Sequence, residues 1–331
     1  MNVLWNPSHS DERVSPICPF RQCDPSMAPH TIARGTDFEY QTLAAEMDYK
    51  QCERCNAVFA TYNPEDSFMS RIYPENYYSF HDSQRDSRLV QSARYFLALF
   101  RYRTVLSRMT TRTPRILDIG CGDGALLRFF KRRLRHARIT GLDSSVKAVQ
   151  VCIESGVPAR VVDIETADAF DAESRYDLIV MNQVLEHLRD PRAVLNRIRE
   201  LLDVGGLLSL ETPAHGSIDH RVFKRRYWAG YHIPRHFWIF DETSLRELLE
   251  LCGLSVVHVE YLINPVAWVH SLQGWVSERR LLSRFSSRLT HRNIVPVAVF
   301  ALAELVLRFV VGRTSNIRVL CIRDDSSASR N

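Results

Sequence analysis

Apolar strand-like segments alternate with helical patterns from Pro114 onward, and this alternation limits the possible folds more than any other feature of the chain. The strand-like segments are 115–119, 138–142, 159–163, 177–182, 206–212, 254–261 and 317–322. The helical patterns between them are 125–135, 145–155, 191–202 and 241–252. Parallel strands need a crossover between them, so repeated strand–helix units build a parallel sheet with helices on both faces. The sequence therefore predicts an α/β domain with a Rossmann-like sheet.

A glycine-rich turn joins the first predicted strand to its helix. The strand 115–119 runs directly into Gly120, Gly122 and Gly124, and the helical pattern starts at Ala125. Glycines let the backbone turn sharply and approach a ligand closely, and the helix start that follows offers free N–H groups. The stretch also fits the Gly-x-Gly-x-x-Ala pattern of dinucleotide sites. The turn therefore predicts a nucleotide-like ligand without deciding its class.

Carboxylates stand at the ends of three successive predicted strands. Asp118 lies two residues before the first glycine, Asp143 closes the second strand and Asp163 closes the third. A carboxylate after the second strand can accept hydrogen bonds from both ribose hydroxyls, and one after the third could face an adenine amino group. Because a pyrophosphate prefers positive or neutral surroundings, this pattern favours a nucleoside without phosphates.

Four segments together resemble the class I methyltransferases that use S-adenosylmethionine (SAM), and the resemblance spans roughly residues 90–262. The segments are Leu117–Gly124, Gly141–Asp143, Val162–Ile164 and Tyr176–His187. The resemblance implies SAM as the cofactor and a seven-stranded, mostly parallel sheet, whose one antiparallel strand is 317–322. It also implies that the chain is an enzyme, a SAM-dependent methyltransferase.

The same resemblance assigns positions around SAM. The glycines of the turn and Asp118 would lie beside its amino-acid part, Asp143 beside the ribose, and Asp163 with Ile164 beside the adenine. Asn182 and Gln183 would line the methionine side. The full set of expected cofactor-binding residues is Asp118, Gly120, Cys121, Gly122, Gly124, Asp143, Ser144, Asp163, Ile164, Asn182 and Gln183.

Two histidines are candidates for a role in the transfer itself. In methyl transfer the protein aligns the nucleophile and excludes water, and an oxygen nucleophile usually needs a base as well. Glu186 and His187 follow the fourth predicted strand, at the edge of the sheet where such folds bind ligands. His236 lies in the aromatic-rich segment 226–238, which could cover an apolar or ring-shaped acceptor. His187, His236 and Glu186 are therefore the candidate catalytic residues, although histidines that only pack the cleft would give the same pattern.

One departure from the family pattern concerns a catalytic metal. In methyltransferases of ubiquinone biosynthesis, the stretch comparable to 183–187 reads Glu-x-x-Glu-His and holds a metal ion. Gln183 replaces the first glutamate here. Because glutamine is an uncharged and poorer ligand, the sequence argues against a catalytic metal and a catechol-like acceptor.

Four cysteines form two spaced pairs near the N-terminus. Cys18 and Cys23 make the first pair, and Cys52 and Cys55 the second. The first residues are polar and lack the apolar core of a signal peptide, so we expect a cytoplasmic protein. Disulfides are not expected in the cytoplasm, so the paired cysteines are better interpreted as metal ligands. Four thiolates suit structural zinc, and the segment around the second pair resembles the zinc-ribbon-like region of some sugar C-methyltransferases. The alternatives are unrelated thiols, or His30 in place of one cysteine.

Near the end of the chain, the segment 277–312 joins a basic stretch to an apolar one. Five arginines precede the run 294–311, which Glu304 and Arg308 interrupt. Such a segment can lie at a membrane surface or form the mouth for a lipid substrate, or it can pack on its own domain or on a second subunit. Peripheral contact with the inner face of the membrane and homodimerisation both stay open. The net charge of +5 is too mild to indicate a nucleic-acid partner.

These observations combine into one predicted organisation. It comprises a flexible tail at 1–17, a zinc-ribbon-like module at 18–66, a lead-in loop and helix at 67–113, a methyltransferase domain at 114–323 with a helical insertion at 263–315, and a flexible tail at 324–331. The predicted function is methyl transfer from SAM to a small-molecule, sugar-linked or lipid-like acceptor. One alternative is an NAD- or nucleotide-sugar-binding oxidoreductase, for which we find no Tyr-x-x-x-Lys set after the middle strands. The other is a non-catalytic scaffold that binds SAM.

Overall fold

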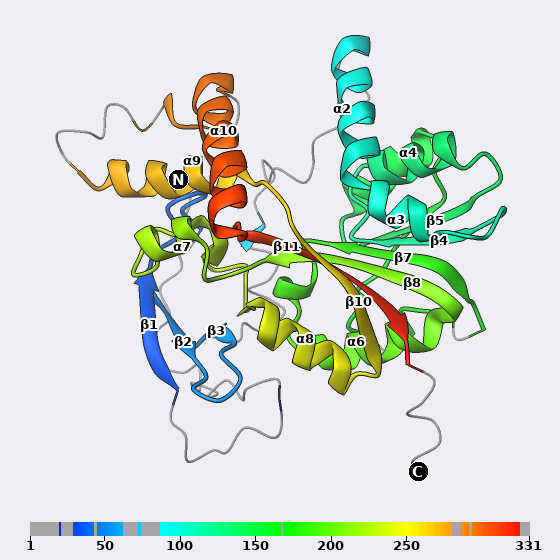
Figure 1. Cartoon of the computed structure of the whole chain (residues 1–331), viewed down its shortest axis with the longest axis horizontal. Coiled ribbons are helices and arrows are strands. Elements are labelled where there is room, and N and C mark those ends of the chain that lie inside the picture. Colours follow the sequence, from blue (N-terminus) through cyan, green and yellow to red (C-terminus); the bar gives the residue numbers. More distant parts are fainter. Residues whose placement is uncertain are drawn as a thin grey trace.

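The computed structural model describes residues 20, 29–42, 45–61, 72–73, 87–166, 168–171, 173–279, 286, 288–290 and 293–324. The predicted tail at 1–17, residues 325–331, and the first cysteine pair, Cys18 and Cys23, lie outside these ranges. The described chain has a large sheet with helices, a small sheet, and two helices inserted before the last strand (Figure 1).

The large sheet has seven strands in the order β10-β11-β8-β7-β4-β5-β6. The strands are β4 (Arg115–Ile119), β5 (Arg138–Asp143), β6 (Ala159–Val161), β7 (Tyr176–Asn182), β8 (Leu202–Pro213), β10 (Leu254–Tyr261) and β11 (Asn316–Arg323). Strands β4 to β8 pair in parallel, whereas β11 runs antiparallel to both of its neighbours. The predicted α/β fold, its seven strands and its antiparallel strand near the C-terminus are confirmed.

Helices cover both faces of this sheet, because residues along each strand alternate between two apolar clusters. On one face, Leu178 and Val180 of β7 share a cluster with α3, α4 and α5, and on the other Ile179 and Met181 share one with α6 and α8. Figure 1 shows α2, α3 and α4 above the sheet and α6 and α8 below it. The helices are α2 (Arg88–Arg101), α3 (Arg103–Arg108), α4 (Ala125–Arg133), α5 (Val146–Glu154), α6 (Pro191–Leu201) and α8 (Glu242–Leu251).

Local signals set where these helices begin. The side chains of Asp190 and Ser145 accept hydrogen bonds from the first turns of α6 and α5, and α8 begins with a reciprocal capping box between Asp241 and Ser244. The helical pattern of the predicted lead-in forms two helices instead of one, because the backbone leaves the helical conformation at Tyr102.

A small antiparallel sheet has the strand order β1-β2-β3-β9. Its strands are β1 (His30–Gly35), β2 (Met47–Gln51), β3 (Val58–Ala60) and β9 (Trp238–Ile239), and β9 follows α7 (Ile218–Phe223) and η4 (Ala229–Tyr231) in the connection after β8. The buried Tyr49 hydroxyl of β2 lies 2.9 and 3.0 Å from the carbonyl oxygens of Tyr231 and His236. The segment predicted as an N-terminal module is therefore built into the loop that carries His236.

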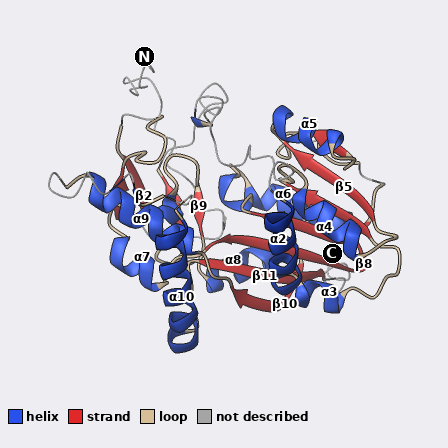
Figure 2. Ribbon diagram, turned by 90° about the horizontal axis from the view of Figure 1, so that it is seen from above, coloured by secondary structure: helices blue, strands red, loops and turns tan. Residues whose placement is uncertain are grey.

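Two helices, α9 (Pro265–Ser277) and α10 (Ile294–Val311), lie between β10 and β11, within the segment predicted as a helical insertion. By length and composition alone, α10 is apolar enough to cross a membrane, with a mean hydropathy of 2.4 over 18 residues. Only 6% of that stretch is buried in the protein. Figure 2 shows α10 and α2 in front when the molecule is seen from above.

Candidate functional site

The turn between β4 and α4 has the backbone conformation that its glycines predict. Gly120, Gly122 and Gly124 have positive φ angles of 74°, 53° and 74°, a region that a side chain would strain. A Cβ at Gly120 would come within 2.4 Å of a methyl group of Val184, whereas one at Gly122 would meet nothing within 4 Å among the described residues. The turn thus packs on the segment after β7 and leaves room for a ligand beside Gly122.

The carboxylates after β4 and β5 have different environments. Asp143 accepts hydrogen bonds from the backbone N–H groups of Gly122, at 2.9 Å, and Ser145, at 2.8 Å, so it holds the glycine turn in place. Asp118 is buried, and this burial, with the carboxylates of Asp143 and Asp123, raises the pKa of Asp118 to about 8. A cationic ligand group placed beside Asp118 would favour its ionised form.

The other predicted cofactor residues near this edge differ in exposure. Ile164 is buried, while Asp163 and Ser144 are exposed. Cys121 is buried within the turn, with its sulfur 3.9 Å from that of Cys152 on α5. Exposure leaves Asp163 and Ser144 accessible to a ligand, whereas Cys121 contributes packing beneath the turn.

Asn182 and Gln183 contact a polar network between β7, β8 and β11. The amide nitrogen of Asn182 donates to the Tyr102 hydroxyl at 2.8 Å, and that of Gln183 donates to the side-chain oxygen of Asn316 at 2.9 Å. Asn316 in turn donates to the buried Glu211 at 2.6 Å. In this structure the Gln183 side chain is therefore engaged with β11.

Glu186, His187 and His236 meet in one cluster at the carboxyl ends of the parallel strands. Glu186 and His187 lie in the short helix η3 (Leu185–His187) after β7, and His236 comes from the loop after β8. One potential ligand atom from each residue lies within 4.8 Å of the other two. All three are candidate catalytic residues on the sequence alone, whereas their convergence is visible only in the structure.

Backbone contacts fix the orientation of both imidazoles. Nδ1 of His187 lies 3.0 Å from the Arg235 carbonyl oxygen, and Nδ1 of His236 lies 2.8 Å from that of Gly230. A carbonyl oxygen can only accept, so we assign the hydrogen to each Nδ1 and the lone pair to each Nε2. Metal-binding histidines are commonly held in this way, because the outer hydrogen bond fixes the tautomer and the ring orientation.

Glu186 and His236 are buried, His187 is partly buried, and the three residues carry no positive charge of their own. Burial, with smaller contributions from neighbouring histidines, lowers the pKa of His187 to about 3 and that of His236 well below its ordinary value. Glu186 is fully buried, and this burial raises its pKa to about 8. Its Oε2 accepts from the Thr212 hydroxyl at 3.0 Å, but Oε1 has no hydrogen-bond partner among the described residues and lies 3.9 Å from His236 Nε2. Two neutral imidazoles and an incompletely bonded carboxylate fit a divalent cation such as zinc.

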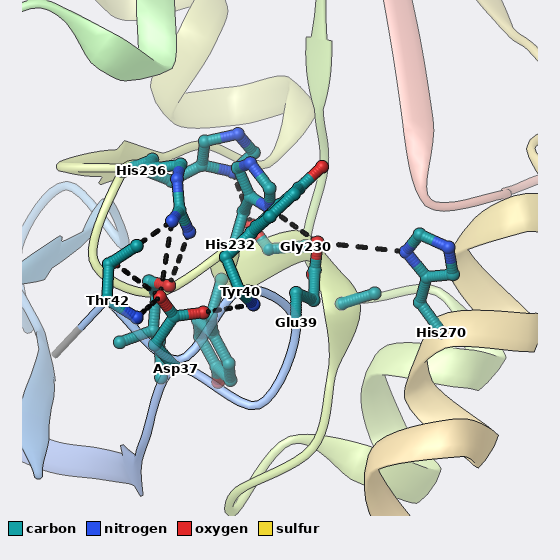
Figure 3. A network of polar contacts seen from close by, with 12 residues as sticks. Asp37, Glu39, Tyr40, Thr42, Gly230, His232, His236 and His270 are labelled. Atoms are coloured by element: carbon teal, nitrogen blue, oxygen red, sulfur yellow. Dashed lines mark hydrogen bonds and ion pairs between the residues drawn. The ribbon is translucent and has the colours of Figure 1, made fainter. Parts of the chain in front are cut away.

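A second layer of charged residues fixes the loop that carries His236 (Figure 3). The fully buried Arg235 pairs with Asp37 at 3.2 Å, and Glu39 lies 3.0 Å from Nδ1 of His232. Burial alone would raise the pKa of Glu39, but its contacts with His232, His270 and Arg235 outweigh burial and lower that pKa to about 2. Asp37 and Glu39 follow β1, so the N-terminal segment positions one wall of the candidate site, which the sequence analysis did not anticipate.

Of the predicted zinc ligands, the structure describes the second cysteine pair. Cys52 and Cys55 lie in the turn between β2 and β3, and both are buried. Two backbone hydrogen bonds close this turn, from Asn56 N–H to the Cys52 carbonyl at 3.0 Å and from Cys52 N–H to the Ala57 carbonyl at 2.9 Å. His30, the alternative ligand, is more than half exposed and lies 3.8 Å from Glu53. The zinc site stays a prediction, because Cys18 and Cys23 are outside the described ranges.

The chain is similar to known methyltransferases. A family described as "Methyltransferase domain" matches residues 89–259, just over half of the 331 residues. A ubiquinone biosynthesis O-methyltransferase of Cereibacter sphaeroides is 30% identical over 168 residues, which cover 48% of this chain and 67% of that protein. One from Escherichia fergusonii is 34% identical over 186 residues, which cover 54% of this chain and 67% of that protein. A SAM-dependent methyltransferase structure from Archaeoglobus fulgidus aligns with a TM-score of 0.46 and 18% identity, over 69% of this chain and 93% of that one.

Proposed function

Since the chain belongs to the methyltransferase-domain family and is a SAM-dependent methyltransferase of small molecules, we propose that it methylates a hydroxyl group on an acceptor bound beside Glu186, His187 and His236. This premise removes the oxidoreductase and non-catalytic scaffold alternatives. Sugar-linked and lipid-like molecules with a free hydroxyl remain within the proposed acceptor class. The O-methyltransferase activity in the names of these two relatives, which are 30% and 34% identical, supports an oxygen acceptor.

The observation that carries the proposal is the position of the cluster relative to the glycine turn. Val184, which packs on Gly120, is separated from Glu186 by a single residue. The turn follows β4 and the cluster follows β7, and these strands are parallel neighbours in the sheet. A cofactor at the turn and an acceptor at the cluster would therefore lie side by side, as an in-line transfer requires.

Ionisation favours a ligand role for the histidines over a base role. A general base works best with a pKa near the working pH, and the pKa of His187 is about 3. Neutral imidazoles whose potential ligand atoms lie within 4.8 Å of a carboxylate oxygen suit a metal instead. Gln183 does not prevent this, because His236 supplies a third donor atom.

We therefore propose that Glu186, His187 and His236 hold a divalent cation, which would lower the pKa of an acceptor hydroxyl. The chain itself orients the two imidazoles through the carbonyls of Arg235 and Gly230. The loop around His236 also limits access of water, since Glu186 and His236 are buried and His187 is partly buried. Both effects keep the reacting groups aligned in a dry site.

Methyl transfer to catechols, phenols and amines by the purified full-length chain tests this proposal. We expect O-methylation of a hydroxyl acceptor, loss of about 90% or more of the rate after chelation, and recovery on addition of Zn²⁺ or Mg²⁺. Methylation of amines alone, or a rate that is indifferent to chelation, would contradict the proposal. The metal content of the same sample tests the structural zinc that we propose for Cys18, Cys23, Cys52 and Cys55, for which we expect zinc that survives mild chelation.

Binding of SAM is expected to release a proton from Asp118 near pH 7. The pKa of Asp118, about 8 in the free protein, lies above the usual range, so most of these carboxyls are protonated at neutral pH. The cationic amino group of SAM favours the carboxylate, so affinity should rise by up to about tenfold per pH unit and level off above roughly pH 8. Calorimetry in two buffers of different ionisation enthalpy measures the released proton. Asp118→Asn should remove the buffer dependence, and a buffer-independent heat for the native protein would refute this role.

A further inference from the structure

Helix α10 exposes a broad apolar stripe. Its exposed apolar side chains are Ile294, Val295, Val299, Leu302, Leu305, Val306, Phe309 and Val310, and Phe309 is 91% exposed. At about 100° per residue, these positions fall on one side of the helix. The opposite side faces the protein, where Glu304 is buried and the Phe300 ring stacks on Trp268 of α9 at 5.4 Å.

Helix α2 has a similar exposed stripe. Phe96, Leu97 and Phe100 are 68%, 68% and 67% exposed, and Val90 extends the same side. Figures 1 and 2 agree that α2 and α10 rise from the same side of the molecule. Two separate helices with large exposed apolar side chains therefore project from one side of the molecule, which is unusual for a surface that contacts only water.

α2 is basic, and a basic stretch leads into α10. There is no Asp or Glu from Ser87 to Leu117, a stretch that contains α2, or from Arg279 to Ala303, which leads into α10. The second stretch holds five arginines in its first fourteen residues. Apolar stripes within acid-free, arginine-rich segments complement an anionic lipid surface. A second copy would bring like charges together, which opposes dimerisation through this face.

Contacts with the protein body show how deeply these helices can enter lipid. Glu304 accepts a hydrogen bond from the backbone N–H of Asn264, so the middle of α10 is fixed to the start of α9. Arg101, at the end of α2, pairs with Glu211, and Arg318 donates to the Arg101 carbonyl at 2.6 Å. Because α9 covers one side of α10, lipid can contact only the exposed apolar stripe of α10. This geometry favours docking on one leaflet over a membrane-spanning helix.

We propose that α2 and α10 form a docking surface for an anionic lipid bilayer. The surface does not depend on the proposed hydroxyl methylation or on the proposed cation. The foot of α2 adjoins Tyr102, which bonds to Asn182 at the end of β7. Docking would therefore hold the cofactor edge of the sheet close to the membrane, where an acceptor partitioned into lipid is concentrated.

Flotation of the full-length protein with vesicles tests the proposal. The vesicles are phosphatidylcholine alone, or phosphatidylcholine with about a third phosphatidylglycerol. We expect flotation with the anionic vesicles only, weakened when salt rises from about 0.05 to 0.5 M. The pair Leu302→Glu with Phe309→Glu, and the pair Phe96→Glu with Leu97→Glu, should each lower the bound fraction by roughly tenfold or more.

Val204→Glu is the matched control, because Val204 is 81% exposed and lies outside both helices. It should float like the native protein, and every variant should keep native SAM affinity, which shows that it is folded. Failure of the native protein to float, or equal flotation with both vesicle types, would overturn the proposal. So would a dimer in sedimentation analysis that Leu302→Glu with Phe309→Glu converts to monomer, because the stripe would then contact a second copy.

Discussion

Replacing Glu186 with glutamine is expected to lower kcat by about a hundredfold or more while SAM affinity stays near the native value. Glutamine has almost the same shape and can still accept the hydrogen bond that Thr212 donates at 3.0 Å. It carries no charge, however, and its amide would place either a poor ligand oxygen or an N–H group toward His236. The variant should therefore lose the proposed cation without losing the fold. Steady-state kinetics and calorimetric titration with Zn²⁺ and Mg²⁺ measure the two effects.

The matched control for this experiment is His136→Ala. His136 is an exposed histidine between α4 and β5, so its loss should leave kcat and metal affinity unchanged. Titration of each variant with SAM checks that the sheet and the glycine turn are intact. A native kcat and native metal affinity for Glu186→Gln would show that the cluster is only a packing feature, and the metal proposal would then fail.

The large sheet could be predicted because its signals are local. The glycine turn that starts at Gly120 follows its strand within the same short stretch, and each predicted strand and helix has its own apolar pattern. The small sheet could not be predicted in the same way. Its last strand, Trp238–Ile239, has only two residues, and it pairs with β3, which lies far away in the sequence. A pattern of two residues has no measurable period, so only tertiary contacts define such a strand.

The candidate site was predictable residue by residue but not as an arrangement. Asp143 and His187 were found because they follow strand ends, where ligands bind in this type of fold. The position of His236 depends instead on the buried pair of Arg235 and Asp37, which are separated by 198 residues. The available sequence signal is the presence of charged residues, Arg226 and Arg235, within the aromatic-rich segment 226–238. The substitution at Gln183 argued against a metal because the sequence could not show that His236 approaches Glu186.

Replacing Asp143 with alanine is expected to raise the dissociation constant of SAM by about a hundredfold. Two losses add in this variant. The proposed ribose hydroxyls lose a charged acceptor, and hydrogen bonds to a charged group contribute about 1.5–3 kcal/mol each. The backbone N–H of Gly122 also loses its acceptor at 2.9 Å, so the turn is less well fixed before the ligand arrives. Calorimetric titration with SAM and S-adenosylhomocysteine measures the change.

Two further variants separate these losses. Asp143→Asn keeps one oxygen acceptor, so its dissociation constant should lie between those of the native protein and Asp143→Ala. Asp171→Ala removes an exposed carboxylate that bonds to Ser174, and it should bind SAM like the native protein. If Asp143→Ala keeps native affinity, the ribose is bound elsewhere and the assignment of the β5 carboxylate is wrong. If both Asp143 variants lose affinity equally, the negative charge matters more than the acceptor geometry, because asparagine preserves the latter in part.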